Sequence, residues 1–284
     1  MSRILVIGDH CHLNEAIAAA LTAFNLPLEC CPEHADALAR LRMQSFAAVI
    51  TSCDSEVEAD LALLAEMRGV QPGLKCIVLA RSSTPDDVIA ALRAHVFACY
   101  TPPFSAGEIA RVAFYAATDG EGKDDIQILS AKPGWLSVRV NCRMVTAERL
   151  MTFERELSAL LPEHRRREMM QALREIIMNS MEHGAGFNPD QTIEVIAICT
   201  ARSLVFYVRD PGSGFDREHL KHAAIGNPPD NPAAHILERE KAGMRPGGYG
   251  LLVASGTVDE LIFNEIGNEV MLIKYLPAIA ADGT

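Results

Sequence analysis

Polar side chains interrupt an otherwise apolar helical pattern in the segment "ALREIIMNSMEHGAG", Ala172 to Gly186. Glu175 and Asn179 are four residues apart, which on an α-helix places them on one face, a single turn from each other. Glu182 and His183 follow in the same segment. Taken alone, the pair Glu175 and Asn179 fits a partly exposed helix face about as well as it fits a binding site.

Two glycine-containing segments lie further along the chain. In "RDPGSGFD" an aspartate, Asp210, follows a strand pattern, and alternating glycines let the backbone fold closely round a ligand whose amino group the carboxylate can bind. In "RPGGYGLLVASG" glycines come directly before an apolar helical pattern, where free N–H groups and the helix dipole favour phosphate. Each segment is a weak signal, but the order and spacing of all three are far less expected by chance.

Together the three segments resemble the ATPase superfamily of histidine kinases, gyrase, heat-shock chaperones and MutL, and most closely its anti-sigma-factor serine kinase branch. The matching motifs are "EIIMNSMEHG", "DPGSG" and "GGYGL", within about Ile128 to Leu276. The resemblance implies an α+β sandwich with a mixed, mainly antiparallel sheet that binds ATP and Mg²⁺.

The resemblance also implies roles for individual residues. Asn179 would coordinate Mg²⁺ through its side-chain oxygen, and Glu175 would act as the general base or orient the attacking hydroxyl. Asp210 would accept a hydrogen bond from the adenine amino group. Gly212 and Gly214 would shape the base pocket. Gly248 and Gly250 would hold the phosphates.

Other charged residues near these motifs have two interpretations each. Lys241 and Arg245 precede the phosphate glycines and would neutralise nucleotide charge, or they are simply solvated on a loop. His183 either packs against or polarises the site, or it is a structural histidine, which is the preferred interpretation. His164 superficially resembles the phosphorylated residue of a histidine kinase, but it lies only eleven residues before Glu175, which leaves no room for a dimerisation hairpin. A solvated helix start is the better interpretation of His164.

The first part of the chain has a different pattern. From Arg3 to about Ala117, short apolar runs such as "RILVI", "FAAVI", "KCIVLA" and "FACY" alternate with helical patterns. Such a repeat predicts a doubly wound parallel sheet, because strands covered by helices on both faces are continuously apolar. The polar segment "TDGEGKDD" then predicts a linker. We therefore expect a domain at 1–117, a linker at 118–127 and the ATPase-like domain at 128–284.

This first domain resembles a response-regulator receiver that has lost its chemistry. Ser52 falls where the phosphoaccepting aspartate belongs, Gly8 replaces one of two acidic metal ligands and leaves Asp9, and Pro102 replaces the lysine. A receiver needs a carboxylate nucleophile, carboxylates for Mg²⁺ and a cation. The resemblance therefore implies a pseudo-receiver that works by binding a partner or by dimerising, with Asp54 as nucleophile only if the register is shifted.

A metal or redox site is a competing hypothesis for the first domain. Asp9, His10, Cys11 and His12 follow the first strand, and Cys53 and Asp54 follow the third, so both groups lie at the carboxyl edge of the predicted sheet. Their side chains suit a soft metal or oxidation sensing. Neighbouring residues in a loop diverge, however, and cysteine is often simply buried, so the structural interpretation is preferred.

Composition excludes several classes of protein. The 284 residues suit two domains, and the net charge of −11 argues against broad nucleic-acid binding, which needs a basic surface. No apolar run reaches the ~20 residues of a membrane helix, and no cleavable signal pattern is visible. The eight cysteines are scattered and fit reduced thiols. We expect a cytoplasmic protein with no membrane contact.

The combined resemblance implies a bacterial signal-transduction partner switch that binds ATP and Mg²⁺. Its implied partner is an anti-sigma-factor antagonist-type protein that it would phosphorylate on serine or threonine; a sigma factor and a second copy of the chain are open as further partners. The alternative is a nucleotide-binding regulatory scaffold without kinase turnover. A histidine kinase ranks third, since no phosphoacceptor module is visible.

Overall fold

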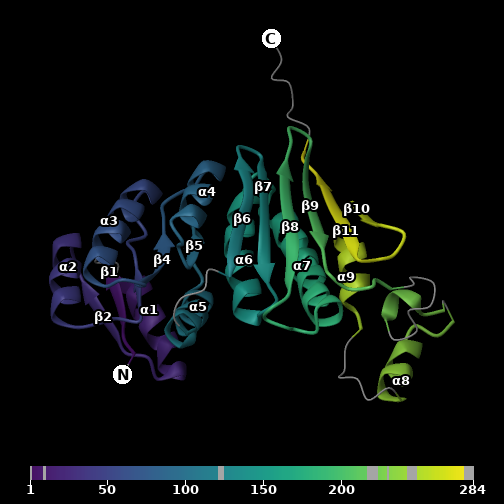
Figure 1. The fold of residues 1–284 in the computed structure, drawn as a ribbon, viewed down its shortest axis with the longest axis horizontal. Helices are drawn as coiled ribbons and strands as arrows, with labels where there is room; N and C mark the ends of the chain where they lie inside the picture. The colour runs from purple at the N-terminus through teal and green to yellow at the C-terminus, as the bar shows by residue number, and fades with distance from the viewer. Residues whose placement is uncertain are drawn as a thin grey trace, which may run out of the picture. The chain divides into compact units, whose positions relative to one another are not determined.

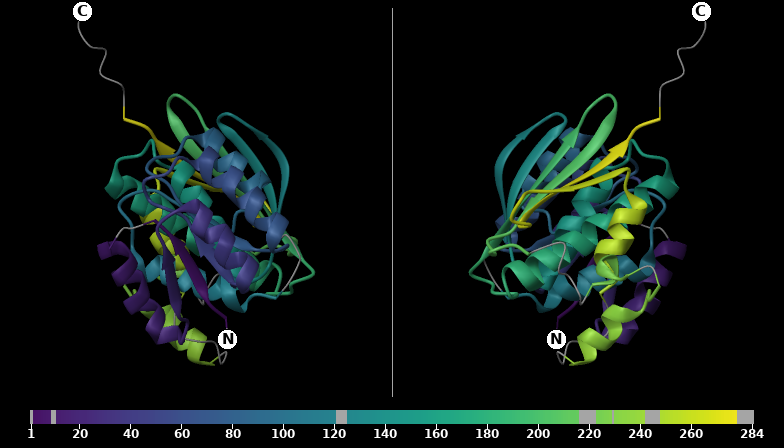
Figure 2. Two further views of the ribbon diagram at one scale, coloured as in Figure 1. Left: turned by 90° about the vertical axis from the view of Figure 1, so that its left-hand side faces the viewer. Right: turned by 90° about the vertical axis from the view of Figure 1, so that its right-hand side faces the viewer.

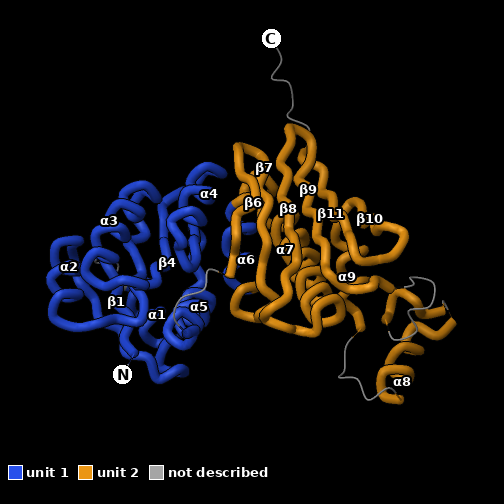
Figure 3. The backbone as a smooth tube through the Cα atoms, in the orientation of Figure 1, with its two compact units in different colours: residues 1–124, 148–156 blue, residues 125–147, 157–284 orange. Residues whose placement is uncertain are grey.

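The computed structural model describes residues 2–8, 11–120, 125–215, 223–228, 230–241 and 248–277. The chain divides into two compact units, shown in Figure 3. The first unit consists of residues 1–124 and 148–156, and the second consists of residues 125–147 and 157–284.

The first unit contains a five-stranded parallel sheet with the order β2-β1-β3-β4-β5 (Figure 1). Its strands β1, β3 and β5 are buried along their whole length, as expected of strands covered by helices on both faces. The order is that of flavodoxin-like doubly wound folds. The strands are β1 (Ile4–Ile7), β2 (Leu28–Cys31), β3 (Ala48–Ile50), β4 (Lys75–Leu79) and β5 (Ala98–Tyr100).

Five helices alternate with these strands, so the predicted receiver-like fold is confirmed. Helix α1 packs against α5, while α3 packs against α2 and α4. The start of α4 is a capping box, in which the Thr84 side chain accepts from the Asp87 N–H and the Asp87 carboxylate accepts from the Thr84 N–H. The helices are α1 (Cys11–Leu21), α2 (His34–Met43), α3 (Val57–Val70), α4 (Pro85–Arg93) and α5 (Ala106–Thr118).

The second unit contains a six-stranded sheet with the order β10-β11-β9-β8-β7-β6. Every neighbouring pair is antiparallel, so the parallel component of the expected mixed sheet is not present among the described strands. The strands are β6 (Ile126–Lys132), β7 (Trp135–Asn141), β8 (Thr192–Cys199), β9 (Ser203–Arg209), β10 (Glu260–Phe263) and β11 (Glu269–Tyr275). Strand β6 begins inside the predicted linker, because this polar edge strand has no strong apolar pattern.

Helices pack on one face of this sheet and form a second layer (Figure 2). The buried residues of α7 recur every three or four positions and form its apolar face: Met169, Ala172, Leu173, Ile176 and Ile177. The helices that begin in this unit are α6 (Met144–Leu157), α7 (Glu163–Asn179), α8 (Ala234–Lys241) and α9 (Gly250–Thr257). Helix α8 lies in a stretch that the sequence pattern predicts as loop.

The centre of α6, residues 148–156, belongs to the first unit. There it contacts the outer edge of β5: the Cys99 N–H donates to the Thr152 hydroxyl at 3.4 Å, and the Thr101 N–H donates to the Glu156 carboxylate at 3.1 Å. These side chains satisfy backbone groups that an edge strand otherwise leaves open. The sequence pattern assigns this helix to the second domain, so the packing differs from the predicted division.

No helix in the described part of the chain combines the length and the apolar character needed to cross a membrane.

Candidate functional site

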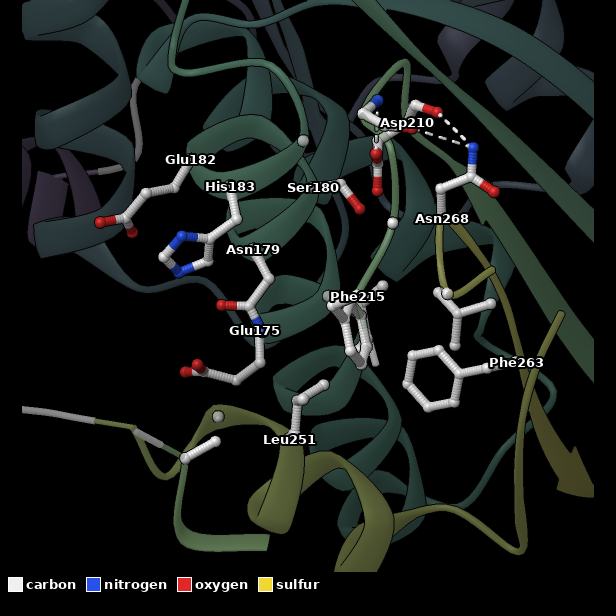
Figure 4. A pocket seen from close by; sticks show the side chains of 18 of the residues that line it. Glu175, Asn179, Ser180, Glu182, His183, Asp210, Phe215, Leu251, Phe263 and Asn268 are labelled. Carbon is white, nitrogen blue, oxygen red and sulfur yellow. Dashed lines mark hydrogen bonds between the residues drawn. The ribbon is translucent and has the colours of Figure 1, made fainter. Parts of the chain in front are cut away.

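A cavity of about 500 Å³ opens in the second unit, between α7, the start of α9 and the loops that follow β9 and β10. Glu175 and Asn179 line it from α7, and both side chains are half-buried. They occupy the helix face beside Ile176 and Ile177, which are buried on the apolar side. Figure 4 shows Asp210 and Ser180 near one end of the cavity and Glu175 near the other. Its volume lies in the ordinary range for small-molecule and cofactor sites.

Asp210 forms one end of the cavity. It follows β9, and its carboxylate accepts hydrogen bonds from the Gly212 N–H at 2.9 Å and from the Ser180 hydroxyl. Burial raises the pKa of Asp210, while these two hydrogen bonds act in the opposite direction. A Cβ atom at Gly184 would lie 2.3 Å from the Asp210 Cγ, so only glycine at position 184 leaves the carboxylate in this place.

The loop after Asp210 is held by the turn between β10 and β11. The Asp210 N–H donates to the Asn268 carbonyl at 3.0 Å, and the Asn268 side chain donates to the Gly212 carbonyl at 3.2 Å. A Cβ atom at Gly214 would lie 1.7 Å from the Ile266 carbonyl oxygen. The close approach of these two backbones therefore requires glycine at 214 and fixes the wall of the cavity.

The other end of the cavity lies at the N-terminus of α9. No side chain of the N-cap residue, Tyr249, caps the first turn of this helix, so its N–H groups are available to an anionic ligand. A Cβ atom at Gly250 would lie 2.5 Å from the Glu175 Oε2 and 3.5 Å from the Asn179 Nδ2. The glycine loop and the polar face of α7 are therefore in direct contact.

The geometry fits a nucleotide with a divalent cation. One end offers a carboxylate for an amino group, and the other offers uncapped helix N–H groups, an amide oxygen and a carboxylate. The glycines leave room for a ligand to approach the backbone closely. A side chain at position 184 would displace Asp210, and one at position 250 would displace Glu175.

The structure brings together most of the residues that the sequence motifs singled out. The seven that line the same cavity are Glu175, Asn179, Asp210, Gly212, Gly214, Gly248 and Gly250. Lys241 is not among the lining residues; its exposed side chain pairs with Glu238 at 2.8 Å. Arg245 lies outside the described residues.

Several lining residues were missed by sequence reasoning. Arg239, one helical turn after the buried His235 on α8, is buried and lines the cavity. Phe215 and Phe263 line it as well and pack edge to face with ring centroids 5.6 Å apart. Ser180, Gly184 and Phe215 lie in the quoted motif segments, so the pattern could have pointed to them. Arg239 and Phe263 lie outside these segments, and only the fold brings them to the cavity.

The two histidines near α7 occupy different environments. His183 lines the cavity from the helical turn after α7, with an exposed side chain. His164 lies in the first turn of α7, as the solvated helix start requires.

The carboxyl edge of the first unit's sheet is arranged differently. Thr51 follows β3 and donates from its hydroxyl to Asp60 Oδ2 at 2.7 Å, and Ser55 donates to the same oxygen at 2.8 Å. Burial raises the pKa of Asp60 to about 6, against the effect of these hydrogen bonds. Ser52 and Pro102 lie two residues after the ends of β3 and β5, at the carboxyl edge where the alignment of the pattern places them.

The proposed cysteine and histidine cluster is only partly visible. Asp9, His10 and the side chain of Cys11 lie outside the described residues. His12 is exposed and lies 4.0 Å from Glu15, and no group of potential metal ligands occurs among the described side chains. No disulfide joins the cysteines whose side chains the structure describes.

A comparison with protein families identifies the second unit. Residues 142–274 match the model of the histidine kinase-like ATPase domain. This part of the chain is therefore similar to histidine kinase-like ATPase domains. The match contains every motif that lines the cavity, and the ATPase domain suggests ATP as the ligand. Among curated proteins, none matches the chain.

Solved structures similar to the chain cover its first part. A response regulator from Thermotoga maritima is 18% identical, with a TM-score of 0.38, over 42% of this chain and 99% of that one. The non-phosphorylated HemR receiver domain from Leptospira biflexa is 15% identical, with a TM-score of 0.39, over 43% of this chain and 99% of that one. Because both TM-scores are low, the fold of the first unit is assigned from its own strand order.

Proposed function

We propose that the protein is an ATP-dependent partner switch in bacterial signal transduction, in which the ATPase domain binds ATP with Mg²⁺. The observation that carries this proposal is the convergence of Glu175, Asn179, Asp210 and the two glycine loops on one cavity in a histidine kinase-like ATPase domain. Those residues come from α7, from the loop after β9 and from the start of α9.

Each group in the cavity has a definite task in this proposal. Asp210 accepts a hydrogen bond from the adenine amino group, held in place by Ser180 and the Gly212 N–H. Asn179 supplies an oxygen ligand to Mg²⁺, and the uncapped N–H groups of α9 receive the phosphates. Glu175, at the same end as Gly250, accepts the proton of an attacking hydroxyl.

The acceptor of the phosphoryl group is a serine or threonine on an anti-sigma-factor antagonist-type protein. The resemblance of the motifs to the anti-sigma-factor serine kinase branch supports this class of partner. Phosphorylation adds about −1.5 to −2 charges to the partner at neutral pH. Against a chain of net charge −11, repulsion then favours release. A sigma factor would be a second partner in the same switch, and the location of the switch would be the cytoplasm.

The first unit is a regulator that does not accept phosphate. Ser52 supplies no carboxylate nucleophile, and Pro102 supplies no cation at the edge where a receiver needs both. Signals reach this unit through binding.

Nucleotide binding is tested by calorimetry on the full chain with ATP and Mg²⁺. The Asp210→Asn variant should weaken binding by the 1.5–3 kcal/mol, roughly, that a hydrogen bond to a charged group contributes. Asn179→Ala should abolish the dependence of affinity on Mg²⁺. The matched control is Asp190→Asn, which changes an exposed carboxylate away from the cavity. If the folded wild type does not bind ATP at millimolar concentration, the proposed function is overturned.

Transfer is tested with radiolabelled ATP and a purified protein of the anti-sigma-factor antagonist type. The kinase predicts acid-stable label on the partner in the wild type and none with Glu175→Ala, which should stay associated. A wild type that binds ATP and the partner without labelling it would support the alternative, a nucleotide-gated scaffold. Acid-labile label on the chain itself would instead indicate a histidine kinase.

A further inference from the structure

Helix α8, Ala234–Lys241, buries two of its residues and leaves the others exposed or half-buried. The first buried residue is His235, which is 0% exposed, and the second is Arg239, which is 8% exposed. The two lie four positions apart, so they share one face of the helix. A histidine and an arginine therefore form the inward face of a short helix near the cavity of the second unit.

Asn227 binds His235 through two hydrogen bonds. Its side-chain oxygen accepts from the backbone N–H of His235 at 2.8 Å and so caps the first turn of α8. Its side-chain nitrogen donates to the Pro232 carbonyl and lies 2.7 Å from the His235 Nδ1. Because an amide nitrogen only donates, Nδ1 accepts, and the neutral ring carries its proton on Nε2. Asn227 therefore fixes both the start of α8 and the orientation of the His235 ring.

The His235 ring also contacts Tyr249, the residue that precedes α9. The two rings pack edge to face, with centroids 4.6 Å apart and planes at 88°. A second attachment is made by the backbone, where the Ala224 N–H donates to the Gly248 carbonyl at 2.8 Å. Gly248 and Tyr249 belong to the glycine segment before α9. Segments on both sides of Asn227 are therefore attached to the glycine segment.

These attachments determine where Arg239 lies. Arg239 comes one helical turn after His235 and lines the cavity, whereas His235 is not among the described residues that line it. The same cavity contains Gly250, at the end of α9 whose uncapped N–H groups suit phosphate. A guanidinium held in this cavity adds a positive charge and N–H donors that match phosphate oxygens.

We propose that His235 is a positioning residue for nucleotide binding, which holds α8 against the glycine segment so that Arg239 contacts the phosphates. The inference rests on the proposed function, because it takes ATP as the ligand of the cavity. His235 itself touches no ligand and acts through Arg239. Its removal should therefore lower the affinity only for ligands that carry phosphates.

The variant His235→Phe separates this role from a general role in packing. Phenylalanine keeps a flat ring to pack against Tyr249 but offers no acceptor to Asn227. Calorimetry on the full chain with Mg²⁺ should show ATP affinity lowered by about 10-fold and adenosine affinity unchanged. Unchanged adenosine binding also shows that the variant is folded. Equal losses of ATP and adenosine affinity would overturn the proposal, because His235 would then support the whole cavity.

The double variant His235→Phe with Arg239→Ala tests whether His235 acts through the arginine. Two residues that act through one contact do not contribute additively. We expect the double variant to lose about 10-fold in ATP affinity, as each single variant does, because the phosphates lack the guanidinium in every case. Independent contributions would multiply to a loss of about 100-fold, which would contradict the positioning role.

The variant His235→Asn tests the contact with Asn227 directly. Its side-chain oxygen lies near the place of Nδ1 and restores an acceptor for the Asn227 amide. It should bind ATP within about 3-fold of the wild type, and an affinity as low as that of His235→Phe would overturn the proposal. His164→Phe makes the same exchange at an exposed position on α7 and should change neither affinity.

The failure of this inference is distinguishable from the failure of the proposed function. A wild type that binds ATP, together with a His235→Phe variant of equal ATP affinity, overturns the positioning role and leaves the proposed function intact. A folded wild type that binds no ATP overturns both.

Discussion

Two polar clusters in this molecule are built from similar side chains and differ in what those side chains face. In the first unit, Thr51 and Ser55 both donate to Asp60, which is fully buried. In the second unit, Glu175 and Asn179 are half-buried and line a cavity of about 500 Å³. The first cluster stabilises a turn, whereas the second presents its groups to a ligand. Residue type alone does not separate these two outcomes.

The physical reason lies in the elements next to each cluster. Asp60 lies in the first turn of α3, where Thr51 and Ser55 donate to its carboxylate and the surrounding residues bury it completely. Glu175 lies where α7 meets the glycine at the start of α9, and glycine brings no side chain to fill the space. An open cavity therefore needs the polar residue and the missing side chain opposite it.

A substitution that fills part of the cavity in the second unit should have the largest effect, which is a loss of ATP affinity. Gly184→Ala adds a Cβ atom 2.3 Å from the Asp210 Cγ and forces that carboxylate to move. We expect ATP affinity, measured by calorimetry, to fall by roughly 10- to 100-fold, the loss of one hydrogen bond to a charged group. Gly256→Ala, in α9 with no atom near its added Cβ, is the control and should bind normally. If Gly184→Ala and Gly256→Ala bound ATP with equal affinity, Asp210 would not be part of the pocket that binds the base.

Removal of the buried arginine of α8 should have an intermediate effect. Arg239 is buried and lines the cavity, whereas Lys241 is exposed and pairs with Glu238. Arg239→Ala should weaken ATP binding by about 10-fold while leaving adenosine binding unchanged, because a cation acts on the phosphates. Lys241→Ala should change neither. A loss of adenosine binding in Arg239→Ala would show that the arginine shapes the base pocket instead.

The closed cluster predicts a pH effect on stability. The pKa of Asp60 is raised from 3.8 to about 6 in the folded state, so between these values the folded protein binds more protons than the unfolded one. The titration of Asp60 therefore lowers the free energy of unfolding as the pH rises through this window, by up to about 3 kcal/mol in total. Above the window this effect no longer changes with pH.

Asp60→Asn removes this titration while keeping an oxygen that accepts from Thr51 and Ser55. The difference in unfolding free energy between variant and wild type, from denaturant titrations at pH 4 and pH 7, should grow in favour of the variant at pH 7. The same difference at both values would mean that Asp60 keeps an ordinary pKa when folded.

The smallest effect is expected at the carboxyl edge of the first unit's sheet, where one substitution should not restore phosphorylation. Ser52→Asp restores a carboxylate to the expected position but adds no cation at Pro102. Incubation with a small phosphodonor should leave no acid-labile phosphate on this variant or on the wild type. Labelling of the wild type would identify Asp54 as the nucleophile and would place the first unit among active receivers.

Much of the architecture was predictable from local pattern. The runs that became β1, β3 and β5 are continuously apolar and buried, as is β4 after its first residue, Lys75. The glycine motifs lie beside strand and helix patterns that the structure confirms as β9 and α9. The grouping of Glu175 and Asn179 follows from helical periodicity alone. These features depend on neighbours within a few residues, which is why the sequence contains them.

Other features were decided only by tertiary packing. Strand β6 forms at the edge of the sheet because its segment pairs with β7, and α8 forms in a stretch whose local signals favour loop. Arg239 rather than Lys241 reaches the cavity because α8 turns one face inward, and the centre of α6 packs on β5 through Thr152 and Glu156. The contact of Gly250 with Glu175 joins residues 75 positions apart. Such contacts depend on distant partners, so the sequence pattern determined the elements and the residue types, while the fold determined which of those residues meet.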